Sequence, residues 1–403
     1  MDKLYEKAEK LLSKEKYTKA FKILSKCAKK GNDKALYKLA ELYESGNGVR
    51  QNPIAAFEIY AKFANAGNVD AQCKLGKMYD TGIGVMQNLE KSKFWYLKAI
   101  EKNNYIAYNL GEIYKKGYGV KVDYEKAVFW YKKATEFGNI YAMYELGVLY
   151  LDGKGVEKDY AKALEYFSTP AEKGIAKAQN SLGYMYAKGF GVKQDYTKAH
   201  EWFKKAADQG YARAQYNLGF DYHKGEGVKQ DYEKAIYWYT KAIDKGDDKA
   251  IVALGDMYYH GKGVKQDYKK ATDLYLQSAK KGNATAQYYL GLDYENGNGL
   301  TKNHRTAFYW YQKAAEQGHA KAQCNLGYMY DKGLGTEKDY NKAFYWFTKS
   351  AAQGFAMGQY NLGSCYHGGK GVSKNLEKAK YWYTKAAEQG FNEAKTALEK
   401  FNK

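Results

Sequence analysis

The stretch NLGYMYDKGLGTEKDY, residues 325–340, decides the fold because its pattern recurs along the whole chain. The glycine of its Leu-Gly pair recurs after one step of 35 residues and otherwise after steps of 36, at Gly76, Gly111, Gly147, Gly183, Gly219, Gly255, Gly291, Gly327 and Gly363. Ala40 takes the same place one step earlier. Self-similarity at this period is the signature of a repeat architecture. The chain is therefore one motif written ten times.

The Gly-Leu-Gly turn in that stretch raises the question of a nucleotide site, since glycine-rich turns before a helix often hold phosphates. The Gly-x-Gly pair is present ten times, from Gly46/Gly48 to Gly369/Gly371. Ten nucleotide sites in series are implausible, whereas ten identical corners are what a repeat needs, because glycine adopts positive φ without a Cβ penalty. The phosphate hypothesis is rejected.

Each unit carries two helical periodicities. Ala142, Leu146 and Tyr150 share one face of a first helix, and Ala127, Trp130 and Ala134 share one face of a second. An Asp or Asn, the best N-cap residues, opens every second helix: Asn52, Asn88, Asp123, Asp159, Asp195, Asp231, Asp267, Asn303, Asp339 and Asn375.

These patterns predict an all-α fold of about 23 helices without strands. We expect a right-handed α/α solenoid superhelix of helix-turn-helix repeats of about 36 residues. Residues 1–31 are predicted to form an N-terminal capping helix pair, residues 32–390 the ten repeats, and residues 391–403 a C-terminal capping helix.

The tryptophans occupy one repeat position: Trp95, Trp130, Trp202, Trp238, Trp310, Trp346 and Trp382. Such a stripe could stack nucleic-acid bases. Its helical spacing with alanines favours packing between helices instead.

The formal charge of +20 suggests a nucleic-acid partner. However, the cations are almost all lysines, with arginine only at Arg50, Arg213 and Arg305. Specific base and phosphate recognition draws on the arginine fork. Lysines on solvated helix faces are the simpler interpretation, and nucleic-acid binding without sequence preference stays as the alternative.

Other features argue against an enzyme or a metal site. The four cysteines (Cys27, Cys73, Cys324, Cys365) are scattered, and no HExxH motif, catalytic triad or other ligand spacing is found. We expect no metal, no cofactor and no catalytic residue. The absence of a signal-like or membrane-spanning apolar stretch predicts a cytoplasmic protein with free thiols, with export by a non-classical or effector route left open.

The motif L-G-x-x-Y-x-x-G-x-G-V-x-x-D-Y-x-K-A-x-x-W-Y-x-K-A-A closely resembles the Sel-like repeat (SLR) family, a branch of the tetratricopeptide superfamily. The resemblance covers residues of about 33–390. It implies a solenoid whose first helices line a concave surface, and a non-catalytic adaptor that binds proteins. Pentatricopeptide RNA readers have a similar period but lack the Gly-x-Gly-Val corner and the Trp-Tyr second helix.

In related tetratricopeptide clamps an asparagine two residues before the Leu-Gly glycine holds a peptide backbone. The resemblance therefore implies a peptide-binding set on the concave face, made of that asparagine, the preceding tyrosine and the aromatic residue just after the glycine. These residues are Tyr108, Asn109, Tyr144, Tyr184, Tyr216, Asn217, Phe220, Tyr288, Asn325, Tyr328, Tyr360 and Asn361. Rings supply apolar area at low entropy cost, and amides pair with backbone groups. The alternatives are that some tyrosines pack between repeats and that the asparagines are merely solvated.

The sequence thus predicts a non-enzymatic scaffold that binds a protein or peptide segment. Its net charge favours an acidic partner through electrostatic steering.

Overall fold

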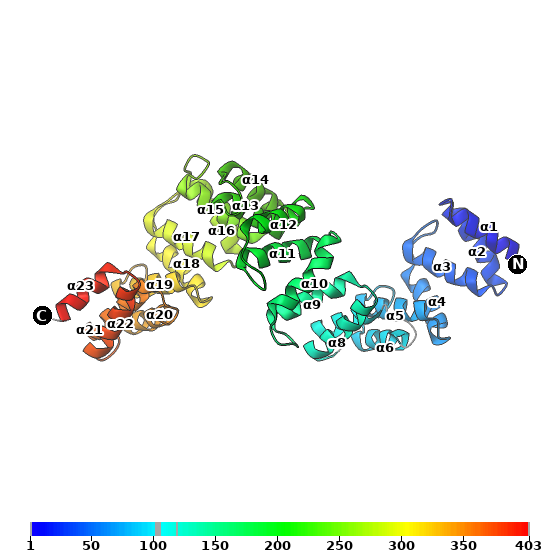
Figure 1. The fold of residues 1–403 in the computed structure, drawn as a ribbon, viewed down its shortest axis with the longest axis horizontal. Helices are drawn as coiled ribbons and strands as arrows, with labels where there is room; N and C mark the ends of the chain where they lie inside the picture. The colour runs from blue at the N-terminus through cyan, green and yellow to red at the C-terminus, as the bar shows by residue number, and fades with distance from the viewer. Residues whose placement is uncertain (1, 101–105, 118–119, 402–403) are drawn as a thin grey trace. The chain divides into compact units, whose positions relative to one another are not determined.

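A computed structural model describes residues 2–100, 106–117 and 120–401 of the chain. The described residues form 23 α-helices and no strand. Consecutive helices lie antiparallel in pairs joined by short corners (Figure 1). The all-α solenoid class predicted from the repeat is confirmed.

We call the two helices of each repeat its first and second helix. The first helices are α3 (Asp33–Ser45), α5 (Val69–Thr81), α7 (Ala107–Lys116), α9 (Ile140–Asp152), α11 (Ala176–Lys188), α13 (Ala212–Lys224), α15 (Asp248–His260), α17 (Ala284–Asn296), α19 (Ala320–Lys332) and α21 (Ala356–Gly368). The second helices are α4 (Pro53–Asn65), α6 (Leu89–Ile100), α8 (Tyr124–Glu136), α10 (Tyr160–Glu172), α12 (Tyr196–Asp208), α14 (Tyr232–Asp244), α16 (Tyr268–Lys280), α18 (His304–Glu316), α20 (Tyr340–Ala352) and α22 (Leu376–Glu388). The repeats are preceded by α1 (Asp2–Leu12) and α2 (Tyr17–Lys29) and followed by α23 (Asn392–Phe401).

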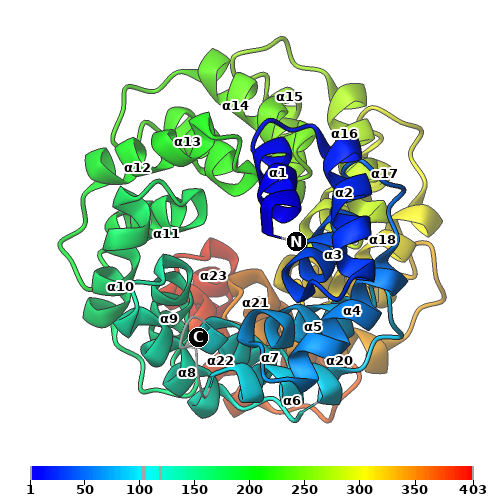
Figure 2. The ribbon, with the colours of Figure 1, turned by 90° about the vertical axis from the view of Figure 1, so that its right-hand side faces the viewer.

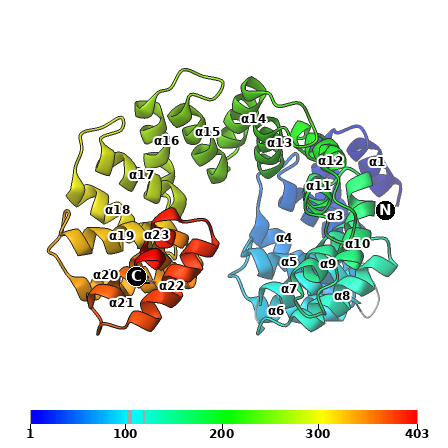
Figure 3. The same ribbon diagram turned by 60° about the vertical axis from the view of Figure 1, so that its left-hand side comes forward.

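The helices divide into two compact units, which we call the N-terminal unit (Met1–Asp195) and the C-terminal unit (Tyr196–Lys403). Within the C-terminal unit the pairs follow one another in chain order from α12 to α23 (Figure 3). There the first helix α13 lies between its neighbours α12 and α14 (Figure 2).

The mid-helix glycine of the Leu-Gly pair lets the two helices of a repeat approach closely. A Cβ added at Gly327 would lie 2.8 Å from the ring of Phe347 and 3.2 Å from the carbonyl oxygen of Ala343. The position of Phe347 holds a buried aromatic ring in every repeat: Tyr60, Tyr96, Tyr131, Phe167, Phe203, Tyr239, Tyr275, Tyr311, Phe347 and Tyr383. The glycine thus makes room for a large buried ring of its own repeat.

The corners and caps have the predicted geometry. The Asp339 carboxylate accepts a hydrogen bond from the Lys342 backbone N–H at 3.0 Å, and so caps α20. Gly335, the second glycine of the corner, has a φ of +69°. A Cβ there would lie 2.3 Å from the carbonyl oxygen of His304, at the start of the preceding second helix. The corner glycine therefore serves both the turn and the contact between repeats.

The tryptophan stripe packs between helices, as the alanine spacing indicated. Trp95 is 9% exposed and belongs to the core cluster around Tyr60 and Leu75. The other six tryptophans are half-buried. Trp346 and Trp382, for example, pack against core clusters that include residues of the preceding repeat.

Candidate functional site

The tyrosines predicted to bind a peptide have one side against the core. In the C-terminal unit, Tyr216, Tyr288 and Tyr360 are half-buried. Their ring centroids lie 5.9, 6.0 and 5.5 Å from those of the buried rings of the following second helices. Tyr108 and Tyr144 make the same contact in the N-terminal unit. Packing therefore orients these tyrosines and still leaves part of each side chain accessible.

The asparagines beside them are half-buried, not freely solvated. Asn109, Asn217, Asn325 and Asn361 all fall in this class. The Asn361 side-chain amide donates to the Cys324 sulfur at 3.4 Å. Asn325 hydrogen-bonds the hydroxyl of Tyr311. The interpretation as solvated surface positions is therefore wrong for Asn325 and Asn361, because each bonds a side chain of a neighbouring helix.

The aromatic residues just after the glycine are the more accessible part of the predicted set. Tyr328 on α19 is 44% exposed and Tyr184 on α11 is 41% exposed. Phe220 on α13 is half-buried. Tyr184 belongs to the N-terminal unit and Tyr328 to the C-terminal unit, so the structure describes two separate groups of candidate residues.

Three first helices of the C-terminal unit, α13, α15 and α17, together with Tyr239 on α14, line an open hollow of about 370 Å³. Two residues of the predicted set, Tyr216 and Phe220, line it. Its other walls include Val252, Ala253 and Tyr289, which were not predicted from the sequence. Their signal was a departure from the repeat pattern, because α15 carries Val-Ala where the neighbouring first helices carry Tyr-Asn and Tyr-Tyr.

We call the side of α13, α15, α17, α19 and α21 that carries Tyr216, Tyr288 and Tyr360 the first-helix face. It is the side on which the hollow opens and on which the tyrosine and asparagine positions recur.

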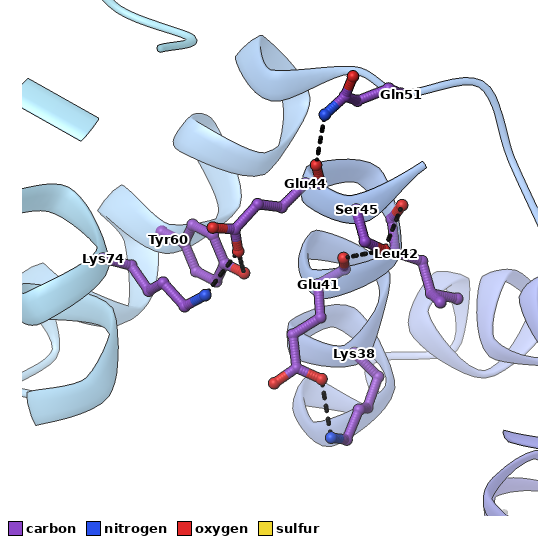
Figure 4. A network of polar contacts seen from close by, with 8 residues as sticks. All are labelled: Lys38, Glu41, Leu42, Glu44, Ser45, Gln51, Tyr60 and Lys74. Atoms are coloured by element: carbon purple, nitrogen blue, oxygen red, sulfur yellow. Dashed lines mark hydrogen bonds and ion pairs between the residues drawn. The ribbon is translucent and has the colours of Figure 1, made fainter. Parts of the chain in front are cut away.

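A polar network accompanies the buried ring in several repeats. In the N-terminal unit the Tyr60 hydroxyl donates to the Glu44 carboxylate at 2.8 Å, and the Lys74 ammonium donates to the same carboxylate at 2.7 Å (Figure 4). Burial alone would raise the pKa of Glu44, but these hydrogen bonds hold the pKa below its ordinary value. Burial, together with the Glu44 carboxylate, raises the pKa of Tyr60.

The same arrangement recurs on other first helices. The Tyr131 hydroxyl donates to Glu112, and the Tyr311 hydroxyl donates to Glu295. Lys115 forms an ion pair with Glu145 on the next first helix. Carboxylates and lysines therefore pair along the first helices, a pattern that the total charge of the chain did not reveal.

Two repeats of the C-terminal unit bury an aspartate where the others carry an apolar residue. Asp221 is 4% exposed and lies 3.1 Å from the His200 ring, and Asp293 is 0% exposed. Burial raises the pKa of Asp221 to about 6, against the lowering effect of His200, and raises the pKa of Asp293 to about 7. Both lie between a first helix and the second helix before it, and neither lines the hollow.

The described residues hold no group of three or more His, Cys, Asp or Glu side chains that could bind a metal ion. None of the helices in this part of the chain is long and apolar enough to span a bilayer. The four cysteines are free thiols, and Cys27, Cys324 and Cys365 are buried.

Comparison with known proteins gives the chain clear relatives. The Sel1 repeat family model matches ten consecutive segments: residues 33–68, 69–104, 107–139, 140–174, 176–211, 212–247, 248–283, 284–319, 320–355 and 356–391. A protective antigen of uropathogenic Escherichia coli that displays an SLR fold is 37% identical, with a TM-score of 0.73, over 94% of this chain and 81% of that one. A Sel1 repeat protein from Oxalobacter formigenes is 32% identical, with a TM-score of 0.59, over 75% of this chain and 88% of that one. No curated protein matches the chain.

Proposed function

Because the chain belongs to the Sel1 repeat family, we propose that it is a non-enzymatic scaffold whose first-helix face binds an extended segment of a partner protein. Solenoids of this family are generally protein–protein interaction scaffolds. The resemblance to tetratricopeptide clamps identifies the same face as the expected concave surface.

The observation that carries the proposal is the recurrence of a supported ring beside an amide. Tyr216, Tyr288 and Tyr360 each rest on a buried ring, so their positions are fixed before any ligand arrives. Binding then costs little side-chain entropy. Asn217 and Asn361 follow two of these tyrosines and supply both a donor and an acceptor.

The repeat spacing suits an extended chain. Packed helices lie about 10 Å apart, and an extended peptide advances about 3.3 Å per residue. One repeat therefore spans about three ligand residues, and a segment of roughly 12 to 15 residues would cross the face by the same spacing.

The test begins with peptides selected from a random library on the full chain. Their affinity is then measured by fluorescence anisotropy for the wild type and for Asn217→Ala/Asn325→Ala/Asn361→Ala. We expect a loss of about tenfold or more, because ligand amides would lose their pairing. A matched control, Lys241→Ala/Lys313→Ala/Lys349→Ala on the second helices, should bind like the wild type. Equal binding by the asparagine variant and the wild type would contradict the proposal.

A second candidate function is electrostatic nucleic-acid binding, favoured by ring–lysine pairs on the second helices. Lys241 lies 5.7 Å from the ring centroid of Tyr237, and Lys349 lies 5.6 Å from that of Tyr345. Both tyrosines are about half exposed. Filter binding of short DNA and RNA at physiological salt tests this function. Tight retention that falls steeply with salt, and that the triple lysine variant loses, would favour it over peptide binding.

A further inference from the structure

The hollow on the first-helix face is bounded by aromatic walls. Tyr216 and Phe220 on α13 form one wall and Tyr289 on α17 forms the other. Val252 and Ala253 on α15 lie between them.

Beside the hollow, α15 carries smaller side chains than the neighbouring first helices α13 and α17 at two positions. Three residues before the Leu-Gly glycine, α13 and α17 carry tyrosine, whereas α15 carries Val252. At the next position Ala253 stands where α13 has Asn217 and α17 has Tyr289. Ala253 is the smallest residue that any of the ten repeats places there. Compared with α13 and α17, α15 therefore leaves space open at these two positions.

The walls are held in place without a ligand. The Tyr289 ring stacks on the buried Tyr275 ring, with centroids 4.9 Å apart and planes 15° apart. Tyr216 lies against the buried Tyr239 ring at 5.9 Å. The space of about 370 Å³ is larger than the engineered apolar cavity of about 150 Å³ that accepts benzene. An open recess of this size with ring and aliphatic walls can hold an aromatic side chain, and polar residues that include His223, Asn283 and Thr285 complete its lining.

The rim of the hollow is basic. Lys224 and Lys249 line it and are exposed. The single carboxylate in the lining, Asp256, lies 3.9 Å from the Lys262 ammonium, which partly offsets its charge. A carboxylate next to the inserted ring would therefore be attracted by Lys224 and Lys249.

We propose that this hollow is an anchor pocket for one aromatic side chain of a bound segment, with an Asp or Glu adjacent to that residue. The proposal rests on peptide binding at the first-helix face and adds what the segment must contain. It also explains why the tyrosine–asparagine positions are interrupted at α15: the ligand supplies the ring that the repeat omits.

The pocket is tested with Val252→Tyr/Ala253→Asn, which restores the pair found on α13. The preceding repeat carries these residues, so the variant is expected to fold, and a circular-dichroism melt checks this. The first probe is indole-3-acetate, observed by saturation-transfer NMR on the full chain. We expect transfer to the indole protons with the wild type and a signal weaker by about tenfold or more with the filled variant. Ser181→Asn, which adds an amide at the equivalent position of α11, is the matched control and should leave the signal unchanged.

The second probe is a pair of labelled peptides, Gly-Asp-Trp-Glu-Gly and Gly-Asp-Ala-Glu-Gly, flanked by the residues of a library-selected binder. The tryptophan peptide should bind the wild type more tightly by about tenfold or more, and this preference should vanish in the filled variant. Lys224→Glu/Lys249→Glu should weaken the acidic tryptophan peptide and spare one with lysines in place of the acids. Unchanged indole-3-acetate binding in the filled variant, or equal affinity of the two peptides, overturns the pocket.

These outcomes are separable from those of the proposed function. If filling the pocket abolishes the tryptophan preference while the triple asparagine variant binds normally, the pocket stands and the asparagine positions fail. If the asparagine variant loses binding while pocket filling has no effect, the scaffold function stands and the anchor pocket fails.

Discussion

Asp293 should make the stability of the C-terminal unit depend on pH in the opposite sense to a salt-bridged carboxylate. Its side chain is 0% exposed. One carboxylate oxygen accepts a hydrogen bond from the Thr272 hydroxyl at 2.9 Å, and the other has no hydrogen-bond partner among the described residues. Burial raises the pKa of Asp293 from 3.8 to about 7. The folded state therefore binds the proton more tightly than the unfolded state does.

The magnitude follows from the two pKa values. A difference of one between the folded and unfolded pKa corresponds to about 1.4 kcal/mol, so the fully ionised carboxylate costs the fold about 4 kcal/mol above pH 7. The cost is absent well below pH 3.8 and grows as the pH rises through the window up to about 7. Between about pH 5 and pH 8 the free energy of unfolding should fall by roughly 2 to 3 kcal/mol from this group alone.

The assay compares urea unfolding of the wild type and Asp293→Met by circular dichroism at pH 5 and pH 8. Methionine is the residue at this position in four other repeats, at Met78, Met185, Met257 and Met329. Thr272 keeps a partner in the variant, because its hydroxyl also lies 3.2 Å from the Asn298 carbonyl oxygen. The variant should be more stable at pH 8, and its change in unfolding free energy between the two pH values should be smaller than that of the wild type by roughly 2 to 3 kcal/mol. Asp221 titrates in both proteins and cancels in the difference. If the two proteins change in parallel between pH 5 and pH 8, the reasoning is refuted.

Three further predictions concern the repeat itself. Gly327→Ala should lower the free energy of unfolding by about 1–3 kcal/mol in a urea titration, since even a Cβ would lie 2.8 Å from the Phe347 ring. Gly327→Leu should lower it by more. An unchanged urea midpoint would show that the two helices do not need this close approach. Asp339→Ala should cost about 1 kcal/mol by thermal melting, because α20 loses its cap, and Asp339→Asn should restore most of it. Asn361→Ala should cost about 0.5–1 kcal/mol and not be neutral, because its amide bonds the Cys324 sulfur; a melt identical to that of the wild type would show that this contact contributes nothing.

The solenoid class could be predicted from sequence because the signal is repeated ten times. A single Asp before a helix is weak evidence, but ten residues of the Asp/Asn type at one position leave little choice of helix start. Gly327 and Phe347 illustrate the same point in the core: a glycine and an aromatic ring recur at fixed positions, and the structure brings them into contact. Local rules suffice here because each repeat packs mainly on its neighbours.

The candidate site was less predictable, because the solvent exposure of each side chain depends on how it packs against helices of its own and the neighbouring repeat. Sequence spacing identified Tyr216 and Tyr288 but could not show how much of each ring the core covers. It left open whether Asn361 is a solvated surface amide, and the structure places it against the neighbouring helix. Total charge was also a poor guide, since Lys74 is neutralised by a carboxylate on another helix.

The departures from the repeat carry information that its consensus does not. A position that is apolar in eight repeats holds Asp221 and Asp293, and each aspartate meets a polar residue, His200 or Thr272, from the preceding second helix. The two partners of each contact therefore differ from the pattern together, as expected if a buried carboxylate must be hydrogen-bonded to be tolerated. These two polar contacts lie at the α12–α13 and α16–α17 junctions, on either side of the segment that contains Ala253. Burying a carboxylate costs stability, although the other eight repeats carry an apolar residue at the same position. Within the C-terminal unit, α15 is the one first helix with neither the tyrosine nor the asparagine. The buried aspartates Asp221 and Asp293 lie on the two first helices next to it, α13 and α17, and this distinguishes α13–α17 from the other described repeats of that unit.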